Sequence, residues 1–280
     1  MKCFYHNDLD GECSAAIVYH FFKNKFKDIF FIEMNYNIPL DIGTINTDEK
    51  VFVVDFSFQK IEEFDRLLKI TKDVTWIDHH KTAIEKHSDK EYLPGIRGVG
   101  GKGNPAACKL TWDYLSNKER PCPRFIELIS DYDSWTYAYN DTKLFKLGLD
   151  LEDTHPASQY WEGRFMLPDE TRETVKNGEI SLRYRDKFWW GLIRGNSFET
   201  EFEGYSGIAC NAGPGVNSDL FQYAPKKDLM LPYFFDGKQF TVSIYTTKDH
   251  IDCSEIAKKY GGGGHKQAAG FQCSELPFKK

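Results

Sequence analysis

Four groups of aspartate and histidine residues in the first half of the chain have the composition of ligands for divalent metal ions. They are His6-Asn7-Asp8-Leu9-Asp10, Asp55, Asp78-His79-His80 and Asp131-Tyr132-Asp133. If the fold brings them together without counter-ions, their carboxylates repel one another and the pKa values of these groups rise. Two divalent cations about 3.5–4 Å apart, bridged by a shared carboxylate, remove that repulsion and can clamp a phosphoryl group. These residue types therefore point to metal-assisted phosphoryl chemistry.

The groups follow segments whose sequence patterns predict secondary structure. Short strands are expected at residues 2–5, 51–54 and 74–77. The second of these, VFVV, has the continuous apolar character of a strand buried on both faces. His6, Asp55 and Asp78 come directly after the three strands. Because the C-terminal ends of parallel strands lie at one edge of a sheet, where ligands bind, we expect these groups to converge there.

Helices are predicted where apolar residues are spaced three and four apart. They cover residues 12–22, 61–70, 105–115 and 123–130. The third begins at Asn104 and Pro105, a pair typical of an N-cap followed by proline in the first helical position. The acidic group from Asp131 would lie just beyond the fourth. With a further strand at 29–34, the order of elements predicts an α/β fold whose mostly parallel sheet has helices on both faces.

The second half of the chain changes character. Residues 155–197 are charged and helix-prone, without a strand pattern, and are interpreted as a helical linker. Strand patterns then return at residues 207–211, 231–235 and 240–245. A short helix is expected at 254–260, followed by a glycine run at 261–264. We therefore expect a catalytic domain at 1–150, a helical linker at 151–200 and a smaller α/β domain at 201–280.

Taken one at a time, the acidic and histidine groups have ordinary structural explanations. An aspartate after a strand is more often a helix cap than a ligand, and for Asp8 or Asp10 alone the cap is favoured. Asp55 could be a turn residue, and a histidine pair usually lies in the core or on the surface. Separate explanations for every group are less economical than one shared site. Mixed Asp and His ligation favours manganese, with zinc, cobalt or iron as alternatives; imidazole is a less natural ligand for magnesium.

The composition limits the kinds of partner. The chain has 280 residues, 41% of them hydrophobic, and a formal net charge of -6. Proteins that hold long DNA or RNA usually have a basic surface, so we expect a short oligonucleotide or nucleotide and no long duplex. Metal ions attract phosphate through their own charge, so an acidic chain can still take a phosphate substrate.

The cysteines and the absence of apolar runs indicate a compartment. Seven cysteines, an odd number without a CxxC pair, argue against a disulfide framework or a thiolate zinc site. No signal peptide precedes Met1-Lys2-Cys3, and no apolar run approaches membrane-spanning length. We expect a cytoplasmic protein without a membrane partner, and a monomer and a homodimer stay equally open.

The order of the motifs HNDLDG, VVDFS, WIDHHKTA, SDYDSW and GGGGHKQAAGF resembles the DHH phosphoesterase superfamily, the last motif being similar to its C-terminal DHH-associated domain. The resemblance is greatest to NrnB-type short-RNA (nanoRNA) phosphodiesterases and more distant to RecJ exonucleases. It implies a metal-dependent phosphodiesterase that hydrolyses short oligonucleotides to mononucleotides with two divalent ions, Mn²⁺ first and Mg²⁺, Co²⁺ or Zn²⁺ as alternatives. A pAp phosphatase, a cyclic dinucleotide phosphodiesterase and a non-catalytic nucleotide-binding module remain open.

The resemblance also implies a role for each site residue. The metal ligands would be His6, Asp8, Asp10, Asp55, His79 and Asp133. Asp55 would bridge both ions, and Asp131 is the alternative to Asp133. His80 would contact the scissile phosphate or orient its water, and Asp78 would hold an imidazole through its ring N–H.

Substrate contacts are expected in the second domain. They are Gly261, Gly262, Gly263, Gly264, His265, Lys266 and Asn211. Glycines let the backbone approach a phosphate or base closely, although a glycine run by itself favours a flexible loop. Many members of the superfamily have an arginine in the strand before this run, where this chain has Tyr245. Its ring could stack on a base or pack in the core, which leaves the identity of the substrate open.

Overall fold

The computed structural model describes residues 1–35, 40–166 and 171–279. The chain divides into two compact units, Met1–Leu182 and Arg183–Lys280, and each is described by itself.

A parallel sheet forms the centre of the first unit. Its strands are β1 (Lys2–His6), β2 (Phe30–Met34), β3 (Val51–Val54) and β4 (Val74–Ile77). They are hydrogen-bonded in the order β2-β1-β3-β4, and each neighbouring pair is parallel. All of β3 and β4 is buried, as their apolar sequences require. The prediction of these strands and of a parallel sheet is confirmed.

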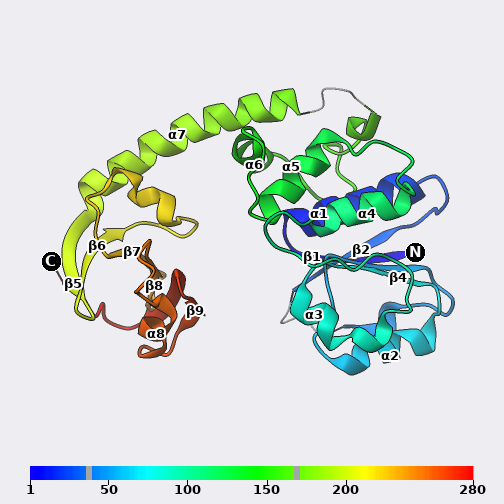
Figure 1. Cartoon of the computed structure of the whole chain (residues 1–280), viewed down its shortest axis with the longest axis horizontal. Coiled ribbons are helices and arrows are strands. Elements are labelled where there is room, and N and C mark those ends of the chain that lie inside the picture. Colours follow the sequence, from blue (N-terminus) through cyan, green and yellow to red (C-terminus); the bar gives the residue numbers. More distant parts are fainter. Residues whose placement is uncertain (36–39, 167–170, 280) are drawn as a thin grey trace. The chain divides into compact units, whose positions relative to one another are not determined.

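Helices cover both faces of this sheet, as predicted. They are α1 (Leu9–Phe22), α2 (Ile61–Ile70), α3 (Lys81–Lys86), α4 (Ala107–Leu115), α5 (Arg124–Asp133) and α6 (Thr142–Leu149). Figure 1 shows α1, α4 and α5 on one face and α2 and α3 on the other. Phe4 and Trp76 belong to a core cluster with Phe64 of α2, whereas Tyr5 belongs to another with Val18 of α1. The alternation of side chains along each strand thus supplies a core on both faces.

Two helix starts differ from the prediction. Helix α1 begins at Leu9 rather than at 12, with Asp8 as its N-cap. Helix α4 begins at Ala107 rather than at 105, because distant side chains bind its first amides. The N–H groups of Ala107 and Cys108 donate to the Asp10 carboxylate at 2.8 and 2.9 Å. The Ala106 N–H donates to Ser130 Oγ at 2.9 Å. These bonds replace the local N-cap that the sequence pattern suggested.

Residues after α6 complete the core of the first unit before the long helix α7 (Arg172–Asn196) begins. Tyr160 and Trp161 are buried there in a cluster with Phe125 and Phe145. Large aromatic rings contribute much of the apolar area of a core. Only the later part of the segment interpreted as a helical linker is therefore helix α7, and the boundary between the two units lies within that helix. Single-turn 3₁₀ helices occur at Ile42–Thr44, Ser88–Lys90 and Arg164–Met166.

A mixed sheet forms the second unit. Its strands are β5 (Ser197–Phe202), β6 (Tyr205–Asn211), β7 (Leu229–Phe235), β8 (Phe240–Tyr245), β9 (Gly263–His265) and β10 (Ala268–Cys273). They follow the order β5-β6-β7-β8-β10-β9. Helix α8 (Cys253–Lys258) packs on one face, and the second half of α7 with the 3₁₀ helix Ser218–Tyr223 packs on the other. Within the described ranges, no helix is both long and apolar enough to cross a membrane.

Candidate metal centre

The C-terminal edge of the parallel sheet gathers the predicted ligands. His6 is the last residue of β1, Asp55 follows β3, and residues 78–80 follow β4. The glycine of HNDLDG is required here by packing, because a Cβ on Gly11 would lie 2.1 Å from the His6 carbonyl oxygen. The close approach of α1 to β1 brings the aspartates of that motif to the same edge.

Asp55 is a fully buried carboxylate without ordinary partners. Neither of its oxygens accepts a hydrogen bond from the described residues, and its backbone has a φ of 54°, a left-handed conformation that is rare outside glycine. Burial, followed by the charges of Asp10 and Asp8, raises the pKa of Asp55 well above its usual range. An Asp8–Asp55 hydrogen bond would require one carboxyl to keep a proton. A cation satisfies both carboxylates without that requirement.

Three sets of possible ligands overlap at Asp55 and His79, and in each set the ligand atoms lie within 4.8 Å of one another. Two of them, His6 with Asp8 and Asp55, and Asp10 with His79 and Asp133, share no residue; the third, Asp55 with His79 and His80, joins them. His79 Nε2 is 3.1 Å from Asp55 Oδ1, and His6 Nδ1 is 3.8 Å from Asp55 Oδ2. Ligands bound about 2.1 Å from one ion are separated by about 3 Å when they meet at right angles. The spacing and the mixture of imidazole and carboxylate therefore fit two divalent cations that share Asp55.

The structure distinguishes the two aspartates of the fourth group. Asp133 Oδ2 lies 3.5 Å from His79 Nε2, and burial with the charges of Asp10 and Asp8 raises the pKa of Asp133 to about 8. Asp131 instead accepts hydrogen bonds from the Ala138 N–H at 2.8 Å, the Tyr139 N–H at 3.3 Å and the Thr142 hydroxyl. Asp131 therefore holds the loop before α6, and Asp133 is left to face the site. Both belong to the last turn of α5, not to a segment beyond it as predicted.

Asp8 and Asp10 have structural and site roles at the same time. Asp8 is the N-cap of α1, accepting the Gly11 N–H at 3.0 Å, and its other oxygen is 2.7 Å from His6 Nδ1. Burial favours a higher pKa, but the His6 and Gly11 interactions outweigh it and lower the pKa of Asp8 to about 2. Asp10 holds the first turn of α4 while its Oδ2 lies 3.6 Å from His79 Nε2. The cap and ligand interpretations are therefore compatible.

Asp78 is buried behind the two histidines and holds them in place. Its Oδ1 accepts the N–H groups of His79 and His80 at 2.7 and 3.1 Å and lies 2.8 Å from the His80 ring nitrogen Nδ1. Its Oδ2 accepts the Ser57 hydroxyl. Burial opposes the charge, but the bonds from His80 and Ser57 outweigh it and lower the pKa of Asp78. Burial likewise opposes a charge on His80, but Asp78 outweighs it and raises the pKa of that imidazole.

A glycine-rich loop covers His79, a contact that the sequence motifs did not mark. The Gly100 N–H donates to the His79 carbonyl oxygen at 2.7 Å. A Cβ at Gly100 would lie 2.8 Å from His79 Nδ1, so only glycine allows the loop this approach. The glycines between residues 98 and 103 were the available signal, but their spacing did not indicate which side chain they would meet.

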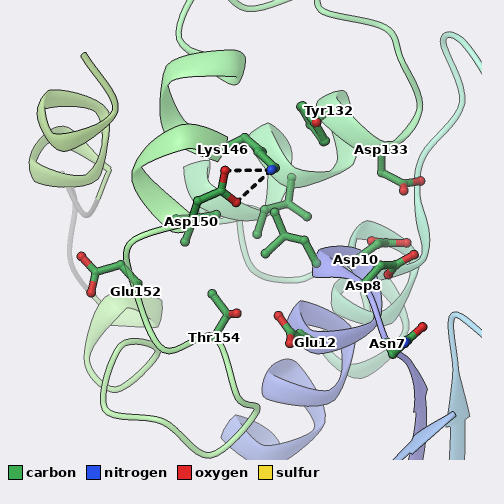
Figure 2. Close-up of a pocket in the computed structure, with 13 residues that line it drawn as sticks. Asn7, Asp8, Asp10, Glu12, Tyr132, Asp133, Lys146, Asp150, Glu152 and Thr154 are labelled. Atoms are coloured by element: carbon green, nitrogen blue, oxygen red, sulfur yellow. Dashed lines mark hydrogen bonds and ion pairs between the residues drawn. The ribbon is translucent and has the colours of Figure 1, made fainter. Parts of the chain in front are cut away.

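A cavity of about 490 Å³ lies beside the ligands Asp8, Asp10 and Asp133. Figure 2 shows these three carboxylates on one side and Lys146 with Asp150 on another. The remaining lining residues are Asn7, Leu9, Glu12, Ile129, Tyr132, Leu149, Glu152 and Thr154. Sequence reasoning missed most of these residues because they carry no motif and come together only when α5 and α6 pack beside α1.

The substrate contacts expected from the glycine run lie in the second unit. Gly263, Gly264 and His265 form the exposed edge strand β9, rather than a loop. Asn211 ends β6, and strands β7, β8 and β10 lie between it and β9. At about 4.8 Å per strand this separation is roughly 19 Å, so Asn211 does not contact the glycines directly. Tyr245 is half-buried in β8 opposite Ala268.

Comparison with known proteins supports the motif resemblance. Residues 3–131, all within the first unit, match the DHH family, N-terminal domain. Oligoribonuclease NrnB of Bacillus subtilis is 24% identical in an alignment covering 98% of this chain and 73% of that protein. An uncharacterized protein of Acanthamoeba polyphaga mimivirus is 26% identical, covering 97% of this chain and 68% of that protein.

A solved structure shares the fold. The pGpG-specific phosphodiesterase PggH of Vibrio cholerae superimposes with a TM-score of 0.57 at 14% identity, covering 98% of this chain and 93% of that one. The alignment extends over both units, and the likeness is one of α/β fold.

Proposed function

From the match of residues 3–131 to the DHH family, N-terminal domain, we propose that this protein is a metal-dependent phosphodiesterase that hydrolyses short oligonucleotides, down to dinucleotides, to mononucleotides. The observation that carries the proposal is Asp55, a buried carboxylate whose oxygens accept no hydrogen bond from the described residues and face an imidazole of each ligand set. Burial of a carboxylate that accepts no hydrogen bond is strongly unfavourable, and a bound cation is the ordinary compensation.

We assign the two sets without a shared residue to two divalent ions, with Mn²⁺ preferred because the donors combine imidazole nitrogen with carboxylate oxygen. His6, Asp8 and Asp55 would hold one ion, and Asp10, His79, Asp133 and Asp55 the other. When bound, the ions supply Lewis-acid polarisation of the phosphoryl group and a water activated near neutral pH.

The chain's own groups then orient the reacting phosphate. His80 is partly exposed and its Nδ1 is bound to Asp78, so the ring is fixed and its protonated form is favoured. A positive imidazole beside the ligands stabilises negative charge that develops on a phosphate in the transition state. The Gly100 loop prevents His79 from turning away from the ligand set.

Short oligonucleotides are the substrate class that the comparisons favour. One relative is named an oligoribonuclease, and the structural neighbour is named for its action on pGpG. The net charge of -6 disfavours a long duplex held by its backbone. Residues 261–266 of the second unit, at and beside β9 and exposed except for the half-buried Gly262, remain our proposed contacts to substrate.

A labelled RNA ladder from dimer to long oligomer tests the proposal. We expect Mn²⁺-dependent loss of the shortest species, its abolition by chelator, and its absence in Asp55→Ala. Equal hydrolysis of long and short chains would contradict the length preference. Turnover of pAp or cyclic di-AMP instead of linear dinucleotides would move the assignment to those substrates, and metal binding without any turnover would indicate a binding module.

A further inference from the structure

The proposed function leaves open which end of a nucleotide substrate the catalytic unit accepts. Resting on that function, we propose that the cavity beside Asp8, Asp10 and Asp133 holds a hydroxyl-ended nucleoside of the substrate and rejects an end that carries a further phosphate. The inference concerns the first unit alone, since all lining residues fall between residues 7 and 154. It would make linear oligonucleotides better substrates than nucleoside bisphosphates such as pAp.

The position of the cavity determines what enters it. Its volume of about 490 Å³ lies within the roughly 300–1,000 Å³ typical of small-molecule sites. Three of the candidate metal ligands form part of its wall, so a phosphate held at the metal centre has the attached nucleoside at the opening of the cavity. The next group along the substrate, beyond that nucleoside, then faces the wall away from the ligands.

That wall is acidic. Asp150 and Glu152 contribute carboxylates there, and the cation Lys146 is already ion-paired with Asp150 at 2.8 Å. Figure 2 shows this pair on the side of the cavity away from Asp133. Glu12 adds a third carboxylate to the cavity, one helical turn from Asp8. At about 7 Å, each pair of like unit charges weakens binding by roughly 3-fold in water and 50-fold at a protein-like dielectric constant. A second phosphate on the bound nucleoside is therefore disfavoured by at least tenfold.

The same wall suits a nucleoside that ends in hydroxyl groups. Carboxylates accept hydrogen bonds and cannot donate them, so they match ribose hydroxyls and exocyclic amino groups of bases. Asn7 and Thr154 add further polar groups. Leu9, Ile129 and Leu149 line the cavity with apolar surface against which a planar base can pack.

Four substrates that differ in which ends carry a phosphate test the inference. Each is assayed with the full chain and Mn²⁺. They are pApA, ApA, pApAp and pAp. Because cleavage polarity is not assumed, a phosphate is added at each end in turn. We expect phosphate at one of the two ends to lower kcat/KM by tenfold or more. We also expect pAp to be hydrolysed at least tenfold more slowly than ApA, which ends in hydroxyl groups on both sides.

The double variant Asp150→Asn/Glu152→Gln tests the acidic wall. It should reduce the ratio of kcat/KM between substrates without and with the disfavoured phosphate by tenfold or more, because it removes two carboxylates and releases Lys146 to bind phosphate. A matched control removes two exposed carboxylates on the other face of the sheet, Glu62→Gln/Glu85→Gln, and should leave the preference unchanged. Thermal denaturation of both variants confirms folding. Equal kcat/KM for all phosphate positions, or an unchanged preference in the cavity variant, overturns the inference.

Failure of the proposed function is recognised separately. If no substrate is hydrolysed although Mn²⁺ binds, the phosphodiesterase assignment fails, and equilibrium dialysis with labelled adenosine, 3′-AMP and 5′-AMP in chelator still tests the cavity. Preferential binding of adenosine, lost in the cavity-filling Thr154→Trp variant, supports the inference. Absence of adenosine binding, or tighter binding of both monophosphates, overturns it.

Discussion

The carboxylates of the metal centre should make the metal-free protein less stable as pH rises. Burial and the charges of Asp10 and Asp8 raise the pKa of Asp133 from 3.8 to about 8. Between these two values the folded protein keeps a proton on this group that the unfolded chain has released. The unfolded state binds fewer protons, so the free energy of unfolding falls as pH rises through this window.

The magnitude follows from the size of the shift. One carboxyl with a raised pKa changes the free energy of unfolding by about 1.4 kcal/mol per pH unit across the window. From pH 4 to pH 8 the loss is on the order of 5 kcal/mol. At about 2–4 °C per kcal/mol for a domain of this size, the Tm of the first unit should fall by on the order of 10 °C.

Calorimetry between pH 5 and pH 8, with chelator and with Mn²⁺, measures this effect. In chelator the transition of the first unit should move to lower temperature as pH rises, and Mn²⁺ should reverse the shift because the cations neutralise the carboxylates. Asp133→Asn should make the Tm of the first unit less dependent on pH in chelator and should reduce the increase in Tm that Mn²⁺ produces. Asp249→Asn, at an exposed position of the second unit, removes the same charge and should change neither.

Two results would refute this reasoning. A Tm that rises or stays constant between pH 5 and pH 8 in chelator would show that the carboxylates are not held together at the sheet edge. An unchanged slope in Asp133→Asn would show that another group is responsible for the dependence.

Three further substitutions separate the roles of neighbouring residues. Asp131→Asn should destabilise the first unit by about 1–3 kcal/mol in denaturant unfolding, because buried donors lose a charged acceptor, yet retain the Tm gain from Mn²⁺. Asp78→Asn should lower the pKa of His80, move the alkaline limb of the pH–kcat/KM profile to lower pH, and reduce kcat by about 10–100-fold. Gly100→Ala should reduce activity by about tenfold or more, since the methyl group would lie 2.8 Å from His79 Nδ1.

Each of these expectations has a contrary outcome. Loss of the Tm gain from Mn²⁺ in Asp131→Asn would show that Asp131 is a metal ligand. An unshifted pH–kcat/KM profile in Asp78→Asn would show that His80 is not the group whose titration sets the alkaline limb. Gly191→Ala is the control for Gly100, because a Cβ there meets no atom within 4 Å. Equal activity of the two alanine variants would show that the loop around Gly100 can move away from His79 without disturbing the catalytic residues.

Local sequence patterns were sufficient for the sheet and most of its helices. The apolar runs of β3 and β4 predicted their strands to the residue, and the periodicity of 61–70 predicted α2. Such patterns are reliable because a strand buried between two layers of helices must be apolar throughout. The start of α4 could not be predicted this way, because its first amides are bound by Asp10, which lies 97 positions earlier in the chain than Ala107.

The residue types and their positions at strand ends were sufficient, from the sequence alone, to predict a group of candidate metal ligands and where on the sheet it would lie. The motif resemblance already favoured Asp133 over Asp131, but only the tertiary structure supplied the physical reason, placed Gly100 against His79 and formed the cavity beside the candidate ligands. The physical reason is that residue type and local spacing specify what a side chain can bind and which element carries it. Which partners it meets depends on packing between elements distant in sequence, and a shift of a few ångströms there decides whether a carboxylate faces a loop amide or a cation.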